Sequence, residues 1–225
     1  MTTLIAEDLL LLLLDDEKGT PTSSSLDTAL GGALLLELAL AGAVHVRERT
    51  SVWSSAKVVV DPGASVADPV LAEALRRVAE RERAASDLVN RLGKGARDAL
   101  GDRLVERGLL VRQEDRVLGL FPRTRWLAAD TAHEAEVRRA LTAVLVQGLQ
   151  PDARTGALVA LLSSVDKAPS AVDLGGVPAR EVRRRAKEVA EGSWAAKAVQ
   201  DAVAAAMAAV MAGVTAATVA TTTSS

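Results

Sequence analysis

The sequence contains no cysteine and no tyrosine, and it has only one phenylalanine, three tryptophans and two histidines. Without cysteine the chain cannot form disulfides, thiolate nucleophiles or cysteine-based zinc sites. An aromatic share of 2% leaves leucine, valine and alanine to fill the core. These residues pack helix against helix better than they build a sandwich of β-strands. The composition therefore favours a mainly helical fold.

The sequence also lacks the patterns of the common catalytic and metal sites. His45 and His133 each stand without a second histidine or a suitably spaced carboxylate, so they do not indicate a metal site. No serine lies in a nucleophile turn, and the glycines match neither the phosphate-loop pattern nor the dinucleotide-binding pattern. We therefore expect no enzyme activity, no cofactor and no bound metal.

Opposite charges nearly balance over the chain, which has a net charge of −2. The field of the whole protein therefore does not attract nucleic acid or an anionic membrane, so any such binding must be local. The one candidate membrane span, residues 202–220, is uncharged and consists mainly of alanine with some threonine and valine. Because alanine partitions weakly into a bilayer, we expect this segment to be a core helix and the protein to be cytoplasmic.

Glycine, proline and polar clusters divide the chain into predicted elements. Helices are predicted at residues 3–14, 26–41, 69–83, 96–107, 132–147, 155–164, 180–191 and 194–214. Short strands are predicted at residues 44–47 and 56–60, and a hairpin at residues 109–121 has its turn at the polar stretch 113–116. We expect one helical domain at residues 1–219, around a central helix bundle with one or two short β-hairpins, and a disordered tail at residues 220–225.

Glu37 lies inside an apolar run at residues 33–41. Burial of an unpaired carboxylate would cost several kcal/mol. We therefore expect Glu37 to have a partner or a path to water, and a structural ion pair explains it better than catalysis does.

Two motifs and the order of the elements resemble the Golgi phosphoprotein 3 family. The first motif combines LLLL at residues 9–12, DDEKG at 15–19 and LGGALLLELALAG at 30–42, and the second is RLVERGLL at 103–110. The likeness continues through PDAR at 151–154 and covers nearly the whole chain in order. It implies a single helical domain, a peripheral membrane protein, and a basic pocket for phosphatidylinositol 4-phosphate beside a membrane-touching hairpin.

The resemblance places the lipid headgroup site at Lys94, Arg97, Gly31 and Thr22. Two family arginines fall on Lys94 and Arg97, so both positive charges are kept. The family's tryptophan falls at about Thr22 and a further arginine falls on Gly31, so an aromatic wall and a guanidinium group are missing. The two remaining charges can hold a phosphate, with weaker selectivity among headgroups. The alternative is that Lys94 and Arg97 are solvated charges at a helix start.

The family's membrane-touching element falls on the hairpin at residues 113–124. Strand alternation cannot bury all of its nearly consecutive apolar residues on one face. These residues are Val117, Leu118, Leu120 and Phe121. We expect some of them to be exposed and to contact a membrane or a second copy of the chain. The alternative is that the protein's own helices cover both faces of this strand.

Two other functions fit the same pattern. A helix followed by a hairpin also describes a winged helix, but acidic residues balance the arginines of the helix at 96–107, so we expect no nucleic acid binding. The family likeness also permits a protein-interaction module that holds the tails of membrane proteins. The expected partners are an anionic phospholipid headgroup and the membrane surface, with membrane-protein tails as the alternative.

Overall fold

A computed structural model of the chain describes residues 3–47, 57–117, 120–192, 203–204 and 207–208. Its helices are α1 (Ile5–Leu13), α2 (Leu26–Leu40), α3 (Pro69–Ala79), α4 (Ala85–Gly93), α5 (Ala96–Glu106), α6 (Ala132–Leu145), α7 (Ala153–Ser164), the 3-10 helix η1 (Ala168–Ala171) and α8 (Ala179–Glu191). Its strands are β1 (Val44–Arg47), β2 (Lys57–Val60), β3 (Arg83–Ala84), β4 (Leu110–Val117) and β5 (Phe121–Ala128). The prediction of a mainly helical fold is confirmed.

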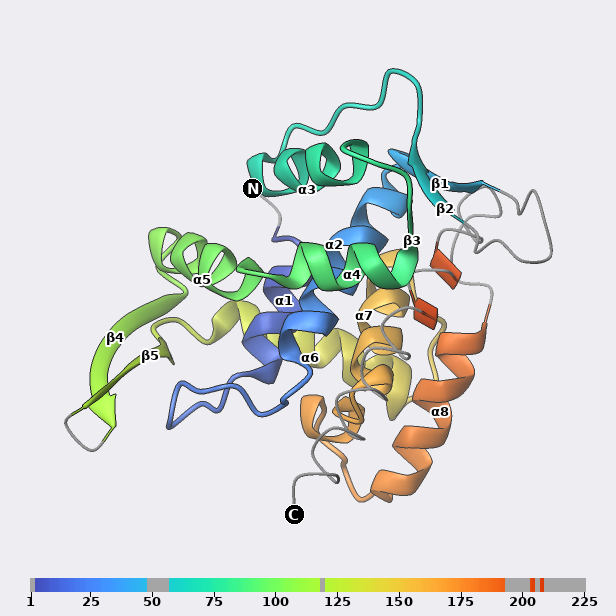
Figure 1. Cartoon of the computed structure of the whole chain (residues 1–225). Helices are drawn as coiled ribbons and strands as arrows, with labels where there is room; N and C mark the ends of the chain where they lie inside the picture. Colours follow the sequence, from blue (N-terminus) through green and yellow to red (C-terminus); the bar gives the residue numbers. More distant parts are fainter. Residues whose placement is uncertain (1–2, 48–56, 118–119, 193–202, 205–206, 209–225) are drawn as a thin grey trace, which may run out of the picture.

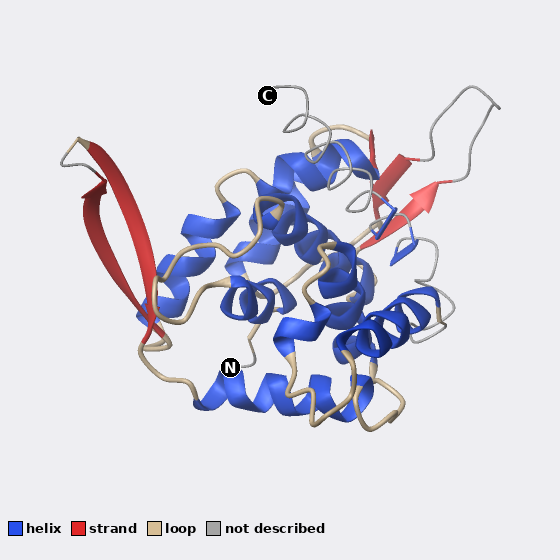
Figure 2. Cartoon of the chain, turned by 90° about the horizontal axis from the view of Figure 1, so that it is seen from below, coloured by secondary structure: helices blue, strands red, loops and turns tan. Residues whose placement is uncertain are grey.

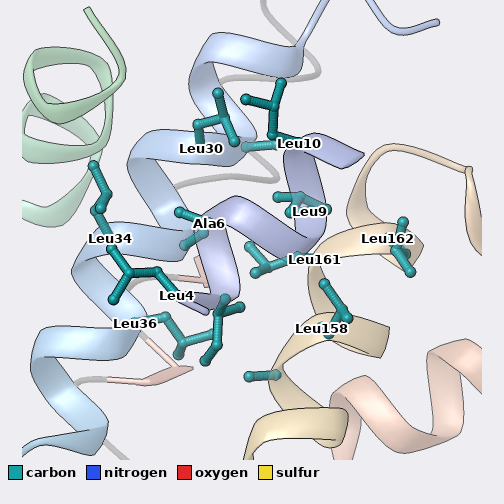
Figure 3. Close-up of a cluster of buried hydrophobic side chains, with 14 of the residues drawn as sticks. Leu4, Ala6, Leu9, Leu10, Leu30, Leu34, Leu36, Leu158, Leu161 and Leu162 are labelled. Carbon is teal, nitrogen blue, oxygen red and sulfur yellow. The ribbon is translucent and has the colours of Figure 1, made fainter. Parts of the chain in front are cut away.

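Helix α1 lies in the middle of the molecule and is buried along its whole length (Figure 1). It packs against α2, α5, α6 and α7. Leucines from α1, α2 and α7 meet in one cluster, which includes Leu9, Leu30 and Leu161 (Figure 3). Every leucine at residues 9–14 is buried, so this short helix removes a large apolar area from water.

Helices α2 and α4 approach closely because each presents a glycine at their contact. A Cβ atom on Gly31 would overlap the carbonyl oxygen of Val89, and a Cβ atom on Gly93 would overlap the carbonyl oxygen of Asp27. The two backbones can therefore touch only because both side chains are absent. The apolar face of α4, which includes Leu88, packs into the core.

Strands β1, β2 and β3 form a small antiparallel sheet at one side of the molecule (Figure 1). The predicted strand at residues 44–47 is confirmed, and most of the strand predicted at 56–60 is confirmed as β2, although Ala56 lies outside the described residues. Strand β3 was not predicted. The helix predicted at residues 69–83 instead ends at Ala79, and the chain then turns to pair Arg83 and Ala84 with β2.

Strands β4 and β5 form a long antiparallel hairpin that stands away from the helices, on the side opposite the small sheet (Figure 2). They pair from Leu110 with Ala128 as far as Val117 with Phe121. The connection therefore lies at residues 118–120, and the prediction of a turn at 113–116 is wrong. The stretch belongs to strand β4, on which Gln113 and Glu114 are exposed, and polar side chains on the solvent face of a strand need no turn.

The base of this hairpin is fixed to the body by Trp126, which is 2% exposed. Its indole ring lies against Gly101 of α5, where a Cβ atom would come within 2.7 Å of the ring. Arg112 of β4 covers the ring, with its guanidinium carbon 5.5 Å from the ring centroid. The buried indole ring of Trp126 therefore fixes the base of the hairpin, while the far end of the hairpin lies outside the core.

The remaining helices are confirmed to within about two residues at most ends, apart from α4 and η1, which were not predicted. The predicted tail at 220–225 and most of the helix predicted at 194–214 lie outside the described residues. Within the part that the structure describes, no helix is both long and apolar enough to span a bilayer.

Candidate headgroup site and charge network

A hollow of about 400 Å³ lies where the loop before α2 meets the first turn of α5. Its lining consists of Pro21, Thr22, Ser23, Ser24, Leu26, Asp27 and Arg97. The structure thus brings together Thr22 and Arg97, two of the residues that the family resemblance assigned to the headgroup site. One is on a loop and the other is on a helix more than 70 residues later, so only the fold joins them.

Arg97 supplies the positive charge of this hollow. Its guanidinium makes a loose contact with Asp98, with 3.7 Å between Nε and Oδ1. The hydroxyl of Thr22 donates to the carbonyl oxygen of Leu13 at 2.9 Å and so fixes the loop to the end of α1. Helix α2 begins at Leu26 without a side-chain cap, so backbone N–H groups of its first turn also favour an anion here.

Asp27 contributes a carboxylate to the same lining. Its negative charge opposes that of Arg97, so the hollow as a whole is not strongly basic. A carboxylate and serine hydroxyls can accept hydrogen bonds from the hydroxyl groups of a ligand, while the guanidinium binds a phosphate. The arrangement suits a ligand that carries both a phosphate and hydroxyl groups.

The other two predicted headgroup residues lie elsewhere. Gly31 is buried in the contact between α2 and α4, where it cannot line a surface site. Lys94 is exposed but lines a separate hollow with residues of α3 and α5. The placement of all four residues in one pocket is therefore corrected to a hollow that contains Thr22 and Arg97, with Lys94 next to it along the chain.

The loop that forms this hollow also touches the hairpin. Arg125 donates from Nε to the carbonyl oxygen of Lys18 at 2.5 Å. The backbone N–H of Trp126 donates to the carbonyl oxygen of Gly19 at 2.8 Å. The loop at residues 15–25 therefore connects the candidate headgroup site to the base of the hairpin.

The end of the hairpin presents apolar surface, as predicted in part. Leu120 is 75% exposed in the connection between the strands. Val117 and Phe121 form the last pair of the ladder, and Leu118 lies outside the described residues. Helices of the described part do not cover Leu120, so the alternative of a doubly covered strand does not hold for this residue.

A second polar feature, a network of charged side chains around α1, was not predicted. Glu7 is fully buried and is held by Arg103 at 3.1 Å and Arg107 at 3.0 Å. Its Oε2 also accepts the backbone N–H of Leu4 at 2.6 Å. These contacts satisfy a carboxylate that would otherwise be costly to bury, and they join the start of α1 to α5.

Asp8 belongs to the same network. It is 3% exposed and pairs with Arg154 at 2.6 Å and with His133 at 2.8 Å. His133 also contacts the hydroxyl of Thr3 at 3.2 Å. This buried carboxylate therefore joins the start of α1 to both α6 and α7.

Glu37 completes the network, which confirms the prediction that it has a partner. Its Oε2 accepts the backbone N–H of Ile5 at 3.0 Å, and its Oε1 lies 3.8 Å from Arg154. Burial raises the pKa of Glu37 to about 7, although Arg154 and the Ile5 N–H favour the ionised form. Since Arg154 pairs more closely with Asp8, Glu37 remains the less neutralised of the two carboxyl groups.

The side chain of Glu37 also lines a larger hollow of about 830 Å³ at the start of α1. Its charged lining consists of Glu37, Asp68, Asp102, Arg103, Glu106, Arg107 and Arg154. With Glu7 and Asp8 directly behind these residues, carboxylates outnumber arginines in this region. The signal that sequence reasoning missed is the spacing of Arg103 and Arg107, which are four residues apart and therefore share one helix face.

The two histidines serve as hydrogen-bonding partners of carboxylates. His45 contacts Asp61 at 2.7 Å, as His133 contacts Asp8. Among the residues that the structure describes, no group of three histidine, cysteine, aspartate or glutamate side chains could hold a metal ion.

The sequence model of a protein family described as Golgi phosphoprotein 3 (GPP34) matches residues 5–206. The match includes the headgroup hollow, the hairpin and the carboxyl groups of the charge network. No curated protein matches the chain.

Proposed function

The chain belongs to the Golgi phosphoprotein 3 family, whose model matches most of its length, and on this premise we propose that it is a peripheral membrane protein that binds an anionic phospholipid headgroup. The family resemblance makes phosphatidylinositol 4-phosphate the first candidate ligand. The proposal is a binding role at the cytoplasmic side of a membrane, without a catalytic step.

The observation that carries this proposal is the hollow that contains Thr22 and Arg97 at the start of α2. A guanidinium beside uncapped N–H groups of a helix is well suited to a phosphate. The carboxylate of Asp27 and the serine hydroxyls would accept hydrogen bonds from an inositol ring. Because the aromatic wall and one guanidinium are missing, we expect weaker discrimination among anionic headgroups than a complete family pocket would give.

The hairpin supports the same proposal. Its exposed Leu120 would enter the membrane interface, while Arg123 and Arg125 on β5 meet anionic headgroups. Both arginines already contact Asp115, so their attraction to lipid is reduced in the free protein. A hydrogen bond from Arg125 to Lys18 links the base of this hairpin to the loop at residues 15–25, which lines the headgroup hollow.

Liposome flotation tests the proposed function. The variant R97A should lose most of its flotation with vesicles that contain phosphatidylinositol 4-phosphate, and its melting temperature should stay nearly unchanged, because an exposed charge contributes little to stability. The matched control R139A removes one exposed positive charge from α6 and should float like the wild type. Flotation of R97A at the level of the wild type and of R139A would exclude the site.

A second function, a holder of membrane-protein tails, is favoured by the acidic hollow around Glu37. Its surplus of carboxylates would attract a basic segment of a partner. A lysine-rich tail peptide should bind the wild type in a fluorescence anisotropy titration, and E37Q/E106Q should weaken its binding. The control E136Q/E191Q changes two exposed carboxylates elsewhere and should leave binding unchanged.

The winged-helix alternative receives no such support. The recognition helix would be α5. Its Arg103 and the Arg107 at its C-terminal cap both pair with the buried Glu7, and their side chains are 18% and 23% exposed. Two arginines held in this way are poorly placed to contact DNA phosphates.

A further inference from the structure

The hollow lined by Lys94 has a different character from the headgroup hollow. It has a volume of about 270 Å³ and lies where α3, α4 and α5 meet over α2. Its apolar lining consists of Leu34, Pro69, Val70, Ala74, Leu92, Ala96 and Ala99. No residue is shared with the lining of the headgroup hollow. We call this space the α3–α5 slot.

The charges at the rim of the α3–α5 slot do not cancel. Arg77 and Glu73 line it as a pair, with 2.9 Å between Arg77 Nε and Glu73 Oε1. Lys94 forms neither an ion pair nor a hydrogen bond with any residue in the described part of the chain. One unpaired ammonium group therefore stands beside an apolar space.

The backbone next to Lys94 adds to this positive end. Gly95, the N-cap residue of α5, and Ala96, its first residue, belong to the lining, and this helix has no side-chain cap. The first N–H groups of α5 therefore carry the positive end of its helix dipole next to the ammonium group. By contrast, the nearby start of α3 is capped by the carboxylate of Asp68.

We propose that the α3–α5 slot binds a single fatty acyl chain whose terminal carboxylate pairs with Lys94. Apolar walls with one unpaired cation at the rim are complementary to an amphiphile with one anionic end. The volume lies below the range of about 300–1,000 Å³ found for drug-sized ligands, so one short chain fits better than a two-chain lipid. This binding is independent of the proposed attachment to membranes.

The walls of the slot also set a limit on chain length. The slot meets the larger acidic hollow at Pro69, Val70 and Ala99, which line both spaces. Beyond these residues the lining becomes charged, and a longer chain would lie against carboxylates and arginines. Affinity should therefore rise from hexanoate to octanoate and decanoate, and then stop rising with dodecanoate and longer chains.

Isothermal titration calorimetry of the full chain with fatty acids, in the absence of vesicles, measures the affinity and tests the inference. Decanoate should bind the wild type saturably, K94A should weaken it about three- to fivefold, and K94R should restore it, as expected for one exposed ion pair. Decanol, which has no charge, should bind the wild type and K94A alike. Because no membrane is present and Lys94 does not line the headgroup hollow, an absence of decanoate binding would not change the interpretation of the flotation experiment.

A second variant tests the apolar walls. Ala99 is exposed at the edge of the slot, so A99F should occupy the space and abolish binding of both decanoate and decanol. The control A135F places the same ring on the exposed face of α6 and should bind like the wild type. The inference is overturned if the wild type shows no saturable binding, if K94E binds decanoate as tightly as the wild type, or if folded A99F does so.

Discussion

Glu37 is a carboxyl group whose pKa is raised to about 7 by burial, against an ordinary value of 4.5. Between these pH values the folded state binds more protons than the unfolded state. The contribution of Glu37 to the free energy of unfolding therefore falls as the pH rises from about 4.5 to about 7, and it stays low at higher pH. The carboxylate is kept in place by the Ile5 N–H and by Arg154.

The variant E37Q should consequently be more stable than the wild type at pH 8, by up to about 3 kcal/mol, and the difference should shrink toward pH 5. Glutamine keeps an acceptor for the Ile5 N–H and removes the charge. Urea unfolding at both pH values measures the effect, and E136Q, an exposed change on α6, serves as the control. A loss of stability of equal size at both pH values would contradict this account.

Gly93 permits the contact of α4 with α2, since a Cβ atom there would overlap the carbonyl oxygen of Asp27. Because the obstacle is backbone, a flexible side chain cannot move aside. G93A should lower the free energy of unfolding by about 3 kcal/mol or more, at the upper end of overpacking effects. S86A, on the exposed face of the same helix, should change it by less than about 0.5 kcal/mol in the same denaturation experiment.

At the level of single residues, the sequence predicted a partner for Glu37 because a charge inside an apolar run needs one. It did not predict that Glu7 and Asp8 are buried, since two acids at the start of a helix also read as solvated residues. Their burial follows from arginines on α5 and α7 that arrive through tertiary packing.

At the level of elements, the long apolar or strongly amphipathic helices were predictable from their spacing. Helix α4 was not predicted, although Ala85, Leu88, Val89 and Leu92 follow helical spacing. The hairpin turn was misplaced because polar residues typify both turns and exposed strands. Only the strand pairing from Leu110 to Val117 in the structure distinguishes an exposed strand from a turn at this stretch.

The exposed end of the hairpin gives a prediction at this scale. L120D should reduce flotation with anionic vesicles, because a carboxylate does not enter the membrane interface, and should leave the melting temperature unchanged. Leu149, which is 58% exposed in the connection between α6 and α7, provides the control. L149D should float like the wild type, and equal losses in both variants would exclude a specific role for the hairpin.

For the whole molecule, the fold explains why the candidate site was only partly predictable. Lys94 and Arg97 are three residues apart, a spacing that would place them on one face of a continuous helix. The chain instead ends α4 at Gly93 and begins α5 after Gly95, which has a φ of +78°. The break sends the two charges to different hollows, and the loop containing Thr22 reaches Arg97 only because α1 and α2 fold back on each other.

The central claim is that an anionic headgroup binds between the start of α2 and Arg97. The most direct measurement is an NMR titration of the ¹⁵N-labelled protein with the soluble headgroup glycerophosphoinositol 4-phosphate. We predict saturable shifts concentrated at the amides of residues 22–27 and at Arg97, which disappear in the variant R97A. Shifts that are absent, or that concentrate away from these residues, would contradict the account.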